Sequence, residues 1–231
     1  MKVIGLIGGM SWHSSLEYYR LINELAAEKL GGLHSARVIV YSLDFDDIEQ
    51  AQRQAQWDAA TAMLVEAGTA LKQAGADFLV ICTNTMHKIA DAVAARVGLP
   101  LLHIGDATGN AIKEQNLHVV GLLGTRFVME ERFYRGRLWE RYGIEVLVPE
   151  EEEQAIVHRI IYDELCQGEI KDSSRRACID ILNGLTERGA QGIVLGCTEL
   201  PLLIQPSDVD VPLFDTTRLH AEAAIKMALA E

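Results

Sequence analysis

The chain has 231 residues, of which 49% are hydrophobic and 23% are charged, the composition of an ordinary globular protein. Its 21 basic and 33 acidic residues give a net charge of −12, which argues against a nucleic-acid-binding protein, since such proteins need a basic face to neutralise phosphates. No apolar run approaches the roughly 20 residues of a membrane-spanning helix, and no signal peptide is indicated. We therefore expect a cytoplasmic protein without a membrane partner.

Short β-branched segments alternate with amphipathic segments along the first half of the chain. The sequence predicts strands at residues 2–7, 38–42, 78–82 and 101–104. It predicts helices at residues 16–30, 50–73, 86–97 and 107–115. Continuous apolar strands between helices are typical of a parallel sheet that is covered on both faces, so this half is predicted to be α/β.

The second half repeats this rhythm. Strands are predicted at residues 118–123, 145–148, 192–195 and 211–214. Helices are predicted to begin at residues 127, 152 and 173, and a last helix to span residues 216–230. The acidic run at residues 150–153 follows Pro149 and is interpreted as a first helical turn, where carboxylates complement the helix dipole.

The two halves also resemble each other residue by residue. Three pairs of segments match in the same order: residues 3–9 with 119–125, 75–84 with 189–198, and 100–101 with 212–213. A repeat of this length indicates a domain duplication rather than a solenoid. The predicted fold is therefore two similar parallel-sheet α/β domains related by pseudo-twofold symmetry. One domain would contain residues 1–98 plus 212–231, the other residues 99–211, with the active site in the cleft between them.

The carboxyl ends of two equivalent strands are the predicted site, because ligands bind there in parallel α/β sheets. The repeat aligns Thr83 with Cys197 and Cys82 with Gly196. Cys197 stands between a strand and a helix N-terminus, so we expect its pKa to be lowered and its thiolate to form readily. Cys82 is one residue early, which on a strand turns a side chain to the opposite face and into the core.

The other two cysteines, Cys166 and Cys178, lie inside helical patterns and are interpreted as core residues. No two cysteines form a C-x-x-C pair, and no His, Asp or Glu residues have convincing metal-ligand spacing. Without an export signal, disulfides are not expected. The sequence therefore predicts no metal site.

Three segments together resemble a known family. They are Gly8-Gly9-Met10-Ser11, Thr83-Asn84-Thr85-Met86-His87 and Gly196-Cys197-Thr198-Glu199. Over nearly its whole length the chain resembles the aspartate/glutamate racemases. The resemblance implies a cofactor-independent enzyme in which two cysteines on opposite faces of the substrate exchange its Cα proton. In this chain the first of those positions is Thr83, whose hydroxyl is a far weaker acid than a thiol of pKa about 8.5.

The resemblance therefore implies an unequal pair, with Cys197 as the thiolate base and Thr83 as its weak partner. The second cysteine of the family faces the proton of the L-enantiomer, so proton exchange on L-aspartate or L-glutamate is expected to be faster than net inversion. The resemblance also implies a set of substrate contacts. They are Met10, Ser11, Gln52, Asn84, Thr85, Thr198 and Glu199.

Charged and titratable residues outside this set are weaker candidates for the site. A side-chain carboxylate of the substrate would need a cation, for which Arg53 and Arg126 are both candidates. His87, at a helix start, is a candidate for orienting its loop. Both His87 and His103 are interpreted first as structural residues.

Three alternatives stay open. A single thiol also suits a decarboxylase of a malonate-like acid, in which it reprotonates one face of a carbanion. Gly5, Gly8 and Gly9 after the first strand are a weak signal for a nucleotide-binding module, because they lack G-x-G-x-x-G spacing. Loss of the first cysteine also fits a non-catalytic amino-acid binding protein. The expected partner is a small-molecule amino acid, and a homodimer is left open.

Overall fold

The computed structural model describes residues 1–230, and the chain divides into two compact units. The first unit contains Met1–Ile104 together with His220–Glu231, and the second contains Gly105–Leu219. The chain therefore leaves the first unit once and returns to it once. We call these two points the crossings.

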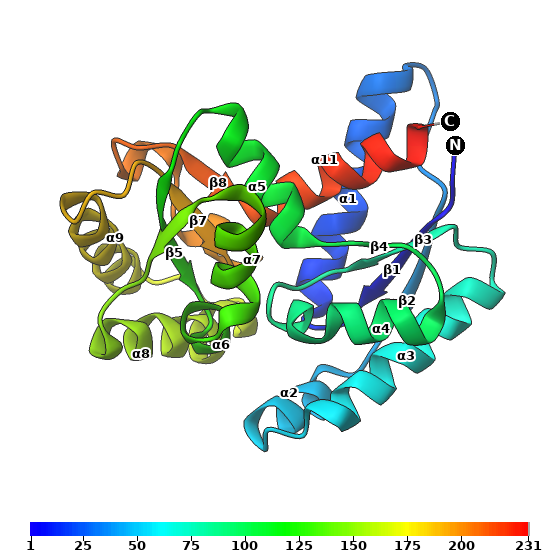
Figure 1. Cartoon of the computed structure of the whole chain (residues 1–231), viewed down its shortest axis with the longest axis horizontal. Helices are drawn as coiled ribbons and strands as arrows, with labels where there is room; N and C mark the ends of the chain where they lie inside the picture. Colours follow the sequence, from blue (N-terminus) through cyan, green and yellow to red (C-terminus); the bar gives the residue numbers. More distant parts are fainter. Residues whose placement is uncertain (231) are drawn as a thin grey trace. The chain divides into compact units, whose positions relative to one another are not determined.

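The first unit is built on a parallel sheet of four strands in the order β2-β1-β3-β4 (Figure 1). The strands are β1 (Ile4–Gly8), β2 (Val38–Ser42), β3 (Phe78–Ile81) and β4 (Leu101–Leu102). The helices are α1 (Trp12–Leu30), α2 (Phe45–Arg53), α3 (Trp57–Gln73), a 3₁₀ helix at Thr85–Ile89, α4 (Ala90–Val97) and the greater part of α11 (Thr216–Leu229).

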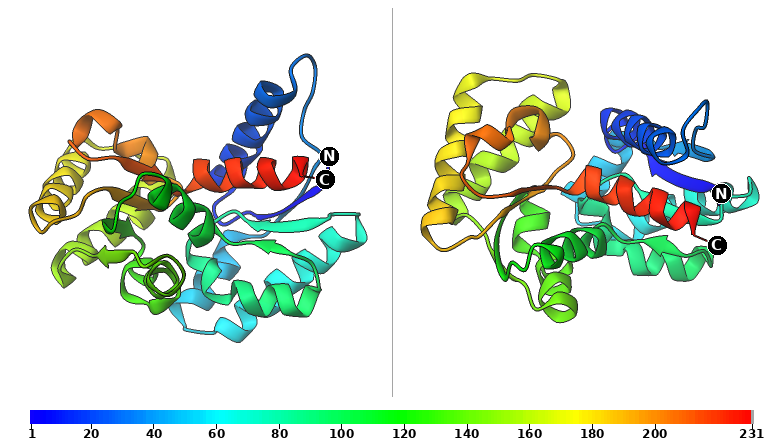
Figure 2. Two further views of the ribbon diagram at one scale, coloured as in Figure 1. Left: turned by 45° about the horizontal axis from the view of Figure 1, so that its top comes forward. Right: turned by 90° about the horizontal axis from the view of Figure 1, so that it is seen from above.

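Both faces of this sheet are buried, as continuous apolar strands predict. Phe78 and Val80 pack in a core with residues of α1 and α11, whereas Leu79 and Ile81 pack on the other face with residues of α3 and α4. Helices α1 and α11 thus cover one face of the sheet, and α3 and α4 cover the other (Figure 1). The last helix also returns to the start of the chain, where the Lys2 N–H group donates to the Ala228 carbonyl at 2.8 Å (Figure 2).

The second unit repeats this topology, with its parallel strands in the order β6-β5-β7-β8. The strands are β5 (Val119–Gly124), β6 (Glu145–Leu147), β7 (Ile193–Gly196) and β8 (Leu213–Asp215). The α-helices are α5 (Ile104–Glu114), α6 (Arg126–Glu130), α7 (Arg132–Tyr142), α8 (Glu151–Arg159), α9 (Asp172–Glu187) and α10 (Leu200–Leu203). A π-helix at Ile160–Glu164 and 3₁₀ helices at Leu165–Gln167 and Pro206–Asp208 complete the unit. The predicted pair of parallel-sheet α/β domains is confirmed.

The strand registers show which residues of the two units are equivalent. Ile7 of β1 lies opposite Ile81 of β3, and Leu123 of β5 lies opposite Leu195 of β7. Ile7 and Leu123 occupy the same position of the repeat, so Ile81 corresponds to Leu195. Two residues further on, Thr83 corresponds to Cys197, as the sequence repeat indicated.

Some predicted elements differ from the structure. Residues 50–73 form two helices, α2 and α3, because Ala55 between them has a positive φ of 54° and leaves the helical conformation. Residues 86–97 divide similarly into a 3₁₀ helix and α4, and α10 was not predicted. The acidic run does begin α8, where Glu150 and Glu153 form a capping box.

The crossings lie a few residues beyond the predicted domain boundaries at 98/99 and 211/212. The first lies after Ile104, because β4 pairs with β3 and so belongs to the first sheet. The second lies after Leu219, because β8 pairs with β7 in the second sheet. Of the helices in residues 1–230, none combines the length and apolarity that a membrane crossing requires.

Candidate active site

A glycine pair shapes the carboxyl end of the first sheet. The Gly9 N–H group donates to the Ser15 hydroxyl at 2.7 Å, and the Leu43 N–H group donates to the Gly8 carbonyl at 3.0 Å. Gly9 has a φ of 90°, and a Cβ there would collide with the Leu43 backbone. The pair therefore lets the loops after β1 and β2 approach closely and leads the chain directly into Met10.

The predicted contacts Met10, Ser11 and Gln52 all lie near this sheet edge. Ser11 caps α1 through its hydroxyl, which accepts from the Ser14 N–H group at 3.4 Å. Met10 and Met86 are buried in one core cluster with residues of α2. The Gln52 side chain is buried too, and its Nε2 donates to the Met86 sulfur at 3.0 Å. The fold thus brings the first loop, α2 and the segment after β3 together.

The segment after β3 has the predicted orientation at Cys82. The Cys82 side chain is fully buried in the core beneath α1 and α11, and this burial raises the pKa of its thiol. Thr83 follows with a partly exposed side chain, and Asn84 and Thr85 are buried at the start of the 3₁₀ helix. Thr83, rather than the neighbouring thiol, therefore occupies the strand-end position.

The equivalent end of β7 carries a thiol and a carboxylate. Cys197 is 7% exposed and Glu199 is 4% exposed. The Cys197 thiol donates to Glu199 Oε2 at 3.1 Å, and the Thr198 hydroxyl donates to the same oxygen at 2.5 Å. One buried carboxylate oxygen thus receives two donors from the two residues that precede it.

This arrangement corrects one prediction, because the Cys197 thiolate is not favoured in the free protein. Burial raises the pKa of Cys197 well above its usual value, and the negative charge of Glu199 raises it further. The helix that follows, α10, has four residues, which is too short for the full dipole that the prediction assumed. Cys197 therefore rests as a neutral thiol that donates a hydrogen bond to the Glu199 carboxylate.

The remaining thiols pack as predicted. Cys178 is buried within the core of the second unit, and Cys166 packs against the same core. Burial, and then the charge of Glu164, raises the pKa of Cys178 to about 12. Neither thiol has a carboxylate acceptor like that of Cys197 among its described hydrogen bonds.

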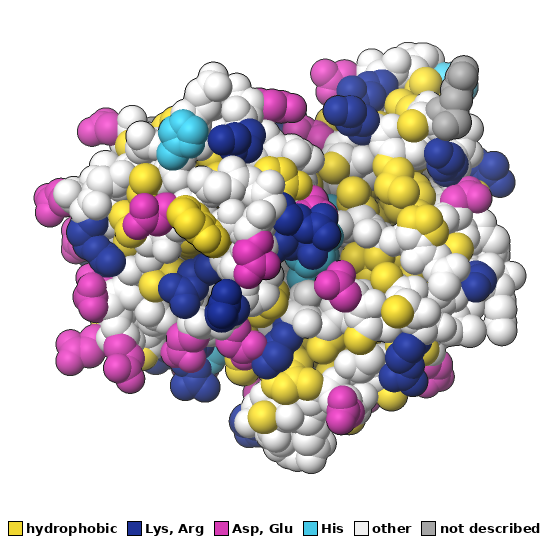
Figure 3. Space-filling view, in the orientation of Figure 1, with side chains coloured by type: hydrophobic (Ala, Val, Ile, Leu, Met, Phe, Trp, Pro, Cys, Tyr) yellow, Lys and Arg dark blue, Asp and Glu magenta, His cyan; other side chains and the backbone are white. Residues whose placement is uncertain are grey.

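The two arginine candidates are exposed and pair within their own helices. The Arg53 side chain is 68% exposed and lies 3.7 Å from Glu49, and that of Arg126 is 55% exposed and lies 3.9 Å from Glu130. Acidic and basic side chains are interspersed on the face of the molecule that Figure 3 shows. Within residues 1–230, no three His, Cys, Asp or Glu side chains gather in a way that could hold a metal ion.

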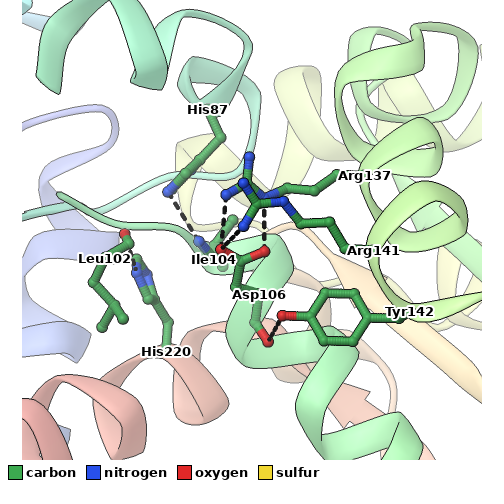
Figure 4. A network of polar contacts seen from close by, with 8 residues as sticks. All are labelled: His87, Leu102, Ile104, Asp106, Arg137, Arg141, Tyr142 and His220. Atoms are coloured by element: carbon green, nitrogen blue, oxygen red, sulfur yellow. Dashed lines mark hydrogen bonds and ion pairs between the residues drawn. The ribbon is translucent and has the colours of Figure 1, made fainter. Parts of the chain in front are cut away.

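The Arg137 side chain of the second unit is less exposed than either of these two candidates. It forms an ion pair with Asp106 at 2.7 Å, and the Tyr142 hydroxyl donates to the Asp106 backbone carbonyl at 3.2 Å (Figure 4). Asp106 also lies 3.3 Å from Arg141. This network joins α5 to α7 and was not predicted.

His87, the candidate for orienting its loop, touches the candidate site directly. Nδ1 of His87 lies 2.8 Å from the backbone carbonyl oxygen of Thr83. The spacing of four residues, one helical turn, is the signal that could have suggested this contact. His87 is therefore a neighbour of the Thr83 backbone.

Known proteins resemble this chain over its full length. A family model described as Asp/Glu/Hydantoin racemase matches residues 7–224. A proposed Asp/Glu racemase from Yersinia pestis is 53% identical over 100% of both chains, with a TM-score of 0.93. An aspartate racemase homologue from Pyrococcus horikoshii OT3 is 35% identical over 100% of both chains, with a TM-score of 0.86.

A more distant relative is the broad specificity amino-acid racemase RacX from Bacillus subtilis (strain 168). It is 21% identical over 99% of this chain and 99% of its own. The family resemblance drawn from the strand-end motifs is thus confirmed. With its two parallel-sheet units and a family match that extends over residues 7–224, the chain belongs to the Asp/Glu/hydantoin racemase family.

Proposed function

We propose that this protein is a cofactor-independent amino-acid racemase that exchanges the Cα proton of an acidic amino acid, with L-aspartate and L-glutamate favoured. The observation that carries the proposal is the hydrogen bond from the Cys197 thiol to the buried Glu199 carboxylate at the end of β7. A thiol beside a carboxylate is a pair that can both release and accept a proton. Membership of the racemase family supports the same assignment.

In the proposed reaction Glu199 first accepts the proton of Cys197. The thiolate then removes the Cα proton of the L-enantiomer, so that the C–H bond breaks and the S–H bond forms again. The electron pair left on Cα is delocalised into the substrate carboxyl group. When Cys197 exchanges its proton with solvent and returns one to the same face, the result is exchange without inversion, and Glu199 gives its proton back to the thiolate. When the Thr83 hydroxyl delivers its proton to the opposite face, the result is the D-enantiomer. The hydroxyl then takes up a proton from solvent, and Glu199 releases the proton that it accepted.

Thr83 is the slower partner in this proposal because a hydroxyl holds its proton more tightly than a thiol does. The neutral side chains Met10, Ser11, Gln52, Asn84, Thr85 and Thr198 are proposed to contact the substrate. Asn and Thr groups bind carboxylate and ammonium groups without placing a formal charge near Cα. The equilibrium between enantiomers stays one to one, since a catalyst changes only the rates.

The test is proton NMR in D₂O on separate L- and D-enantiomers, combined with chiral chromatography of the products. L-aspartate or L-glutamate should exchange its Cα proton faster than it inverts, and the D-enantiomer should exchange more slowly. Equal exchange of both enantiomers would contradict the unequal pair. A panel that exchanges neutral or basic amino acids but no acidic one would contradict the substrate class, and a panel without any exchange would contradict the racemase proposal.

A decarboxylase is the second candidate, favoured by one observation. Of the two equivalent strand-end positions, only Cys197 carries a thiol, and its raised pKa keeps it protonated, as a proton donor to a carbanion must be. The reaction would release CO₂ from a malonate-like acid and deliver the thiol proton to one face of the product. CO₂ release with formation of a single enantiomer, in the absence of amino-acid exchange, would establish this function instead.

A further inference from the structure

Three buried histidines gather in the first unit although they come from distant parts of its sequence. His87 follows β3, His103 follows β4, and His220 lies in α11. The ring centroids of His87 and His103 lie 4.7 Å apart, and those of His87 and His220 lie 5.4 Å apart. Three imidazolium charges at this spacing would repel strongly, so the cluster requires neutral rings.

The hydrogen-bond partners of two of these rings fix their tautomers. Nε2 of His87 accepts from the Ile104 N–H group at 3.2 Å, so Nδ1 carries the proton and donates to the Thr83 carbonyl at 2.8 Å. His220 has the opposite tautomer. Its Nε2 donates to the Leu102 carbonyl at 2.9 Å, and its Nδ1 accepts from the Tyr18 hydroxyl at 2.8 Å.

The electrostatics agree with neutral rings. Burial lowers the pKa of His87 well below its usual value, and the neighbouring His103 and His220 lower it further. Burial likewise lowers the pKa of His220 to about 4. At neutral pH both rings therefore keep the donor and acceptor that their backbone partners require.

These bonds form two links that meet in one short segment. One link runs from Thr83 through His87 to the N–H group of Ile104, and the other runs from Tyr18 through His220 to the carbonyl of Leu102. Figure 4 shows the bond from Ile104 to His87 and the bond from His220 to Leu102. Ile104 is the last residue before the first crossing, and His220 is the first residue after the second crossing. The backbone of Thr83 is thus tied to the segment where the chain leaves the unit.

We propose that His87 is a positioning residue that fixes the backbone of Thr83 against Ile104, while His220 secures the same segment at Leu102. The inference rests on the proposed function, because it assigns His87 an effect on the Thr83 side of the reaction and none on the Cys197 side. A weak hydroxyl partner depends strongly on placement, since a displacement of about 1 Å can cost about a hundredfold in rate. A neutral histidine supplies that placement without adding a charge.

Two substitutions at position 87 separate the two bonds of the ring. In His87→Asn the amide nitrogen takes the place of Nδ1 and can still donate to the Thr83 carbonyl. In His87→Gln the side chain reaches the place of Nε2 and can accept from Ile104, but it has no donor in the place of Nδ1, from which the ring donates to Thr83. His103→Asn is the matched control, because it removes a buried histidine of the same cluster and retains the bond from His87 to Thr83.

The readout is the ratio of inversion to exchange, measured on L-aspartate in D₂O. We expect His87→Gln to lower this ratio by about tenfold or more, and His87→Asn and His103→Asn to keep it within about threefold of the wild type. A ratio in His87→Gln equal to that of the wild type would overturn the inference. So would an equal loss in His103→Asn, which would indicate a general effect of disturbing the cluster. If inversion by the wild type is too slow to measure, the same series is made in the Thr83→Cys background.

A second measurement does not require activity. In ¹⁵N-labelled wild-type protein, His87 should show a protonated Nδ1 and an unprotonated Nε2 at pH 7. The backbone carbonyl ¹³C resonance of Thr83 should shift in His87→Gln and stay in place in His103→Asn. An Nε2–H tautomer of His87, or a Thr83 carbonyl resonance that does not shift in His87→Gln, would contradict the inference. Absence of any amino-acid exchange, with the NMR result as expected, would contradict the proposed function alone.

Discussion

The ends of β3 and β7 are equivalent in register but differ in chemistry. After β7 a thiol donates to a buried carboxylate, so the proton donor and its acceptor are neighbouring side chains. After β3 the thiol of Cys82 lies in the core, and Thr83 is tied through its backbone carbonyl to a neutral histidine. One end therefore places a thiol donor beside a carboxylate acceptor, and the other places a backbone carbonyl beside a histidine ring.

The difference shows that a duplicated fold preserves positions more strictly than it preserves chemistry. Strand order and register are the same in both units, because continuous apolar strands and the helices that cover both faces fix them. The side chain at each strand end is not constrained in this way and can diverge. Four experiments test this difference between the two strand ends.

Replacement of the thiol at position 197 should have the largest effect. Cys197→Ala should lower Cα exchange on L-aspartate by about a thousandfold, because it removes the group proposed to carry the proton. Cys82→Ala is the matched control, since it removes a buried thiol on the other strand and should change exchange by less than about twofold. A similar loss in both variants would mean that Cys82 takes part in the reaction. The rates are measured by NMR in D₂O.

Replacement of the carboxylate beside this thiol should separate acidity from activity. Glu199→Gln removes a negative charge, so the pKa of Cys197 should fall and its alkylation by iodoacetamide should begin at lower pH. Exchange should nevertheless fall by about a hundredfold, because the proton acceptor is lost. Faster exchange in this variant would show that Glu199 only hinders the thiol. Alkylation of the Cys197 peptide is followed by mass spectrometry.

The buried, neutral His220 predicts that the stability of the protein depends on pH. Burial lowers the pKa of His220 from 6.5 to about 4, so between these values the unfolded chain binds more protons than the folded one. The neutral His220 ring therefore contributes fully to the free energy of unfolding above pH 6.5. This contribution is lost as the pH falls, and the loss is about 2 kcal/mol by pH 5.

The pH-dependent loss should be smaller by this amount in His220→Gln, in which His87 still titrates, and unchanged in Tyr18→Phe, which keeps the histidine and removes only its hydroxyl partner. Urea unfolding at pH 7 and pH 5 measures it. Equal pH dependence in the wild type and in His220→Gln would show that His220 does not titrate as described.

Changing the hydroxyl at position 83 should have a smaller and graded effect. Thr83→Cys should raise net inversion by about tenfold, because a thiol releases its proton more readily than a hydroxyl does. Thr83→Val, which has nearly the same shape and no hydroxyl, should lower inversion below that of the wild type. Equal inversion rates in the wild type, Thr83→Cys and Thr83→Val would show that the Thr83 hydroxyl takes no part in the reaction. Chiral chromatography of the product measures these rates.

The sequence was sufficient for the architecture because the architecture depends on local patterns. Apolar runs such as residues 78–81 predicted the strands, and the internal repeat predicted two α/β units. The break at Ala55 was not predictable in this way, because Arg53, Gln54 and Ala55 all suit a helix and none of them favours the positive φ that Ala55 adopts.

The sequence could predict which residues stand at the two strand ends, but not the protonation states of Cys197 and His87. The repeat located Thr83 and Cys197 from spacing alone. The neutral state of Cys197 depends on burial and on the distance to Glu199, and the tautomer of His87 depends on Ile104, a residue from another segment. These are properties of the folded environment, and no local pattern carries them.

The return of α11 to the first unit has a consequence for the order in which the protein can form during synthesis. The core beneath α1 includes Ala221 and Ile225, so the first unit lacks one side of its interior until those residues have been made. The second unit ends at Leu219 and is complete before them. Since domains fold as units when their residues have emerged, the unit encoded in the middle of the chain is the first that can be finished.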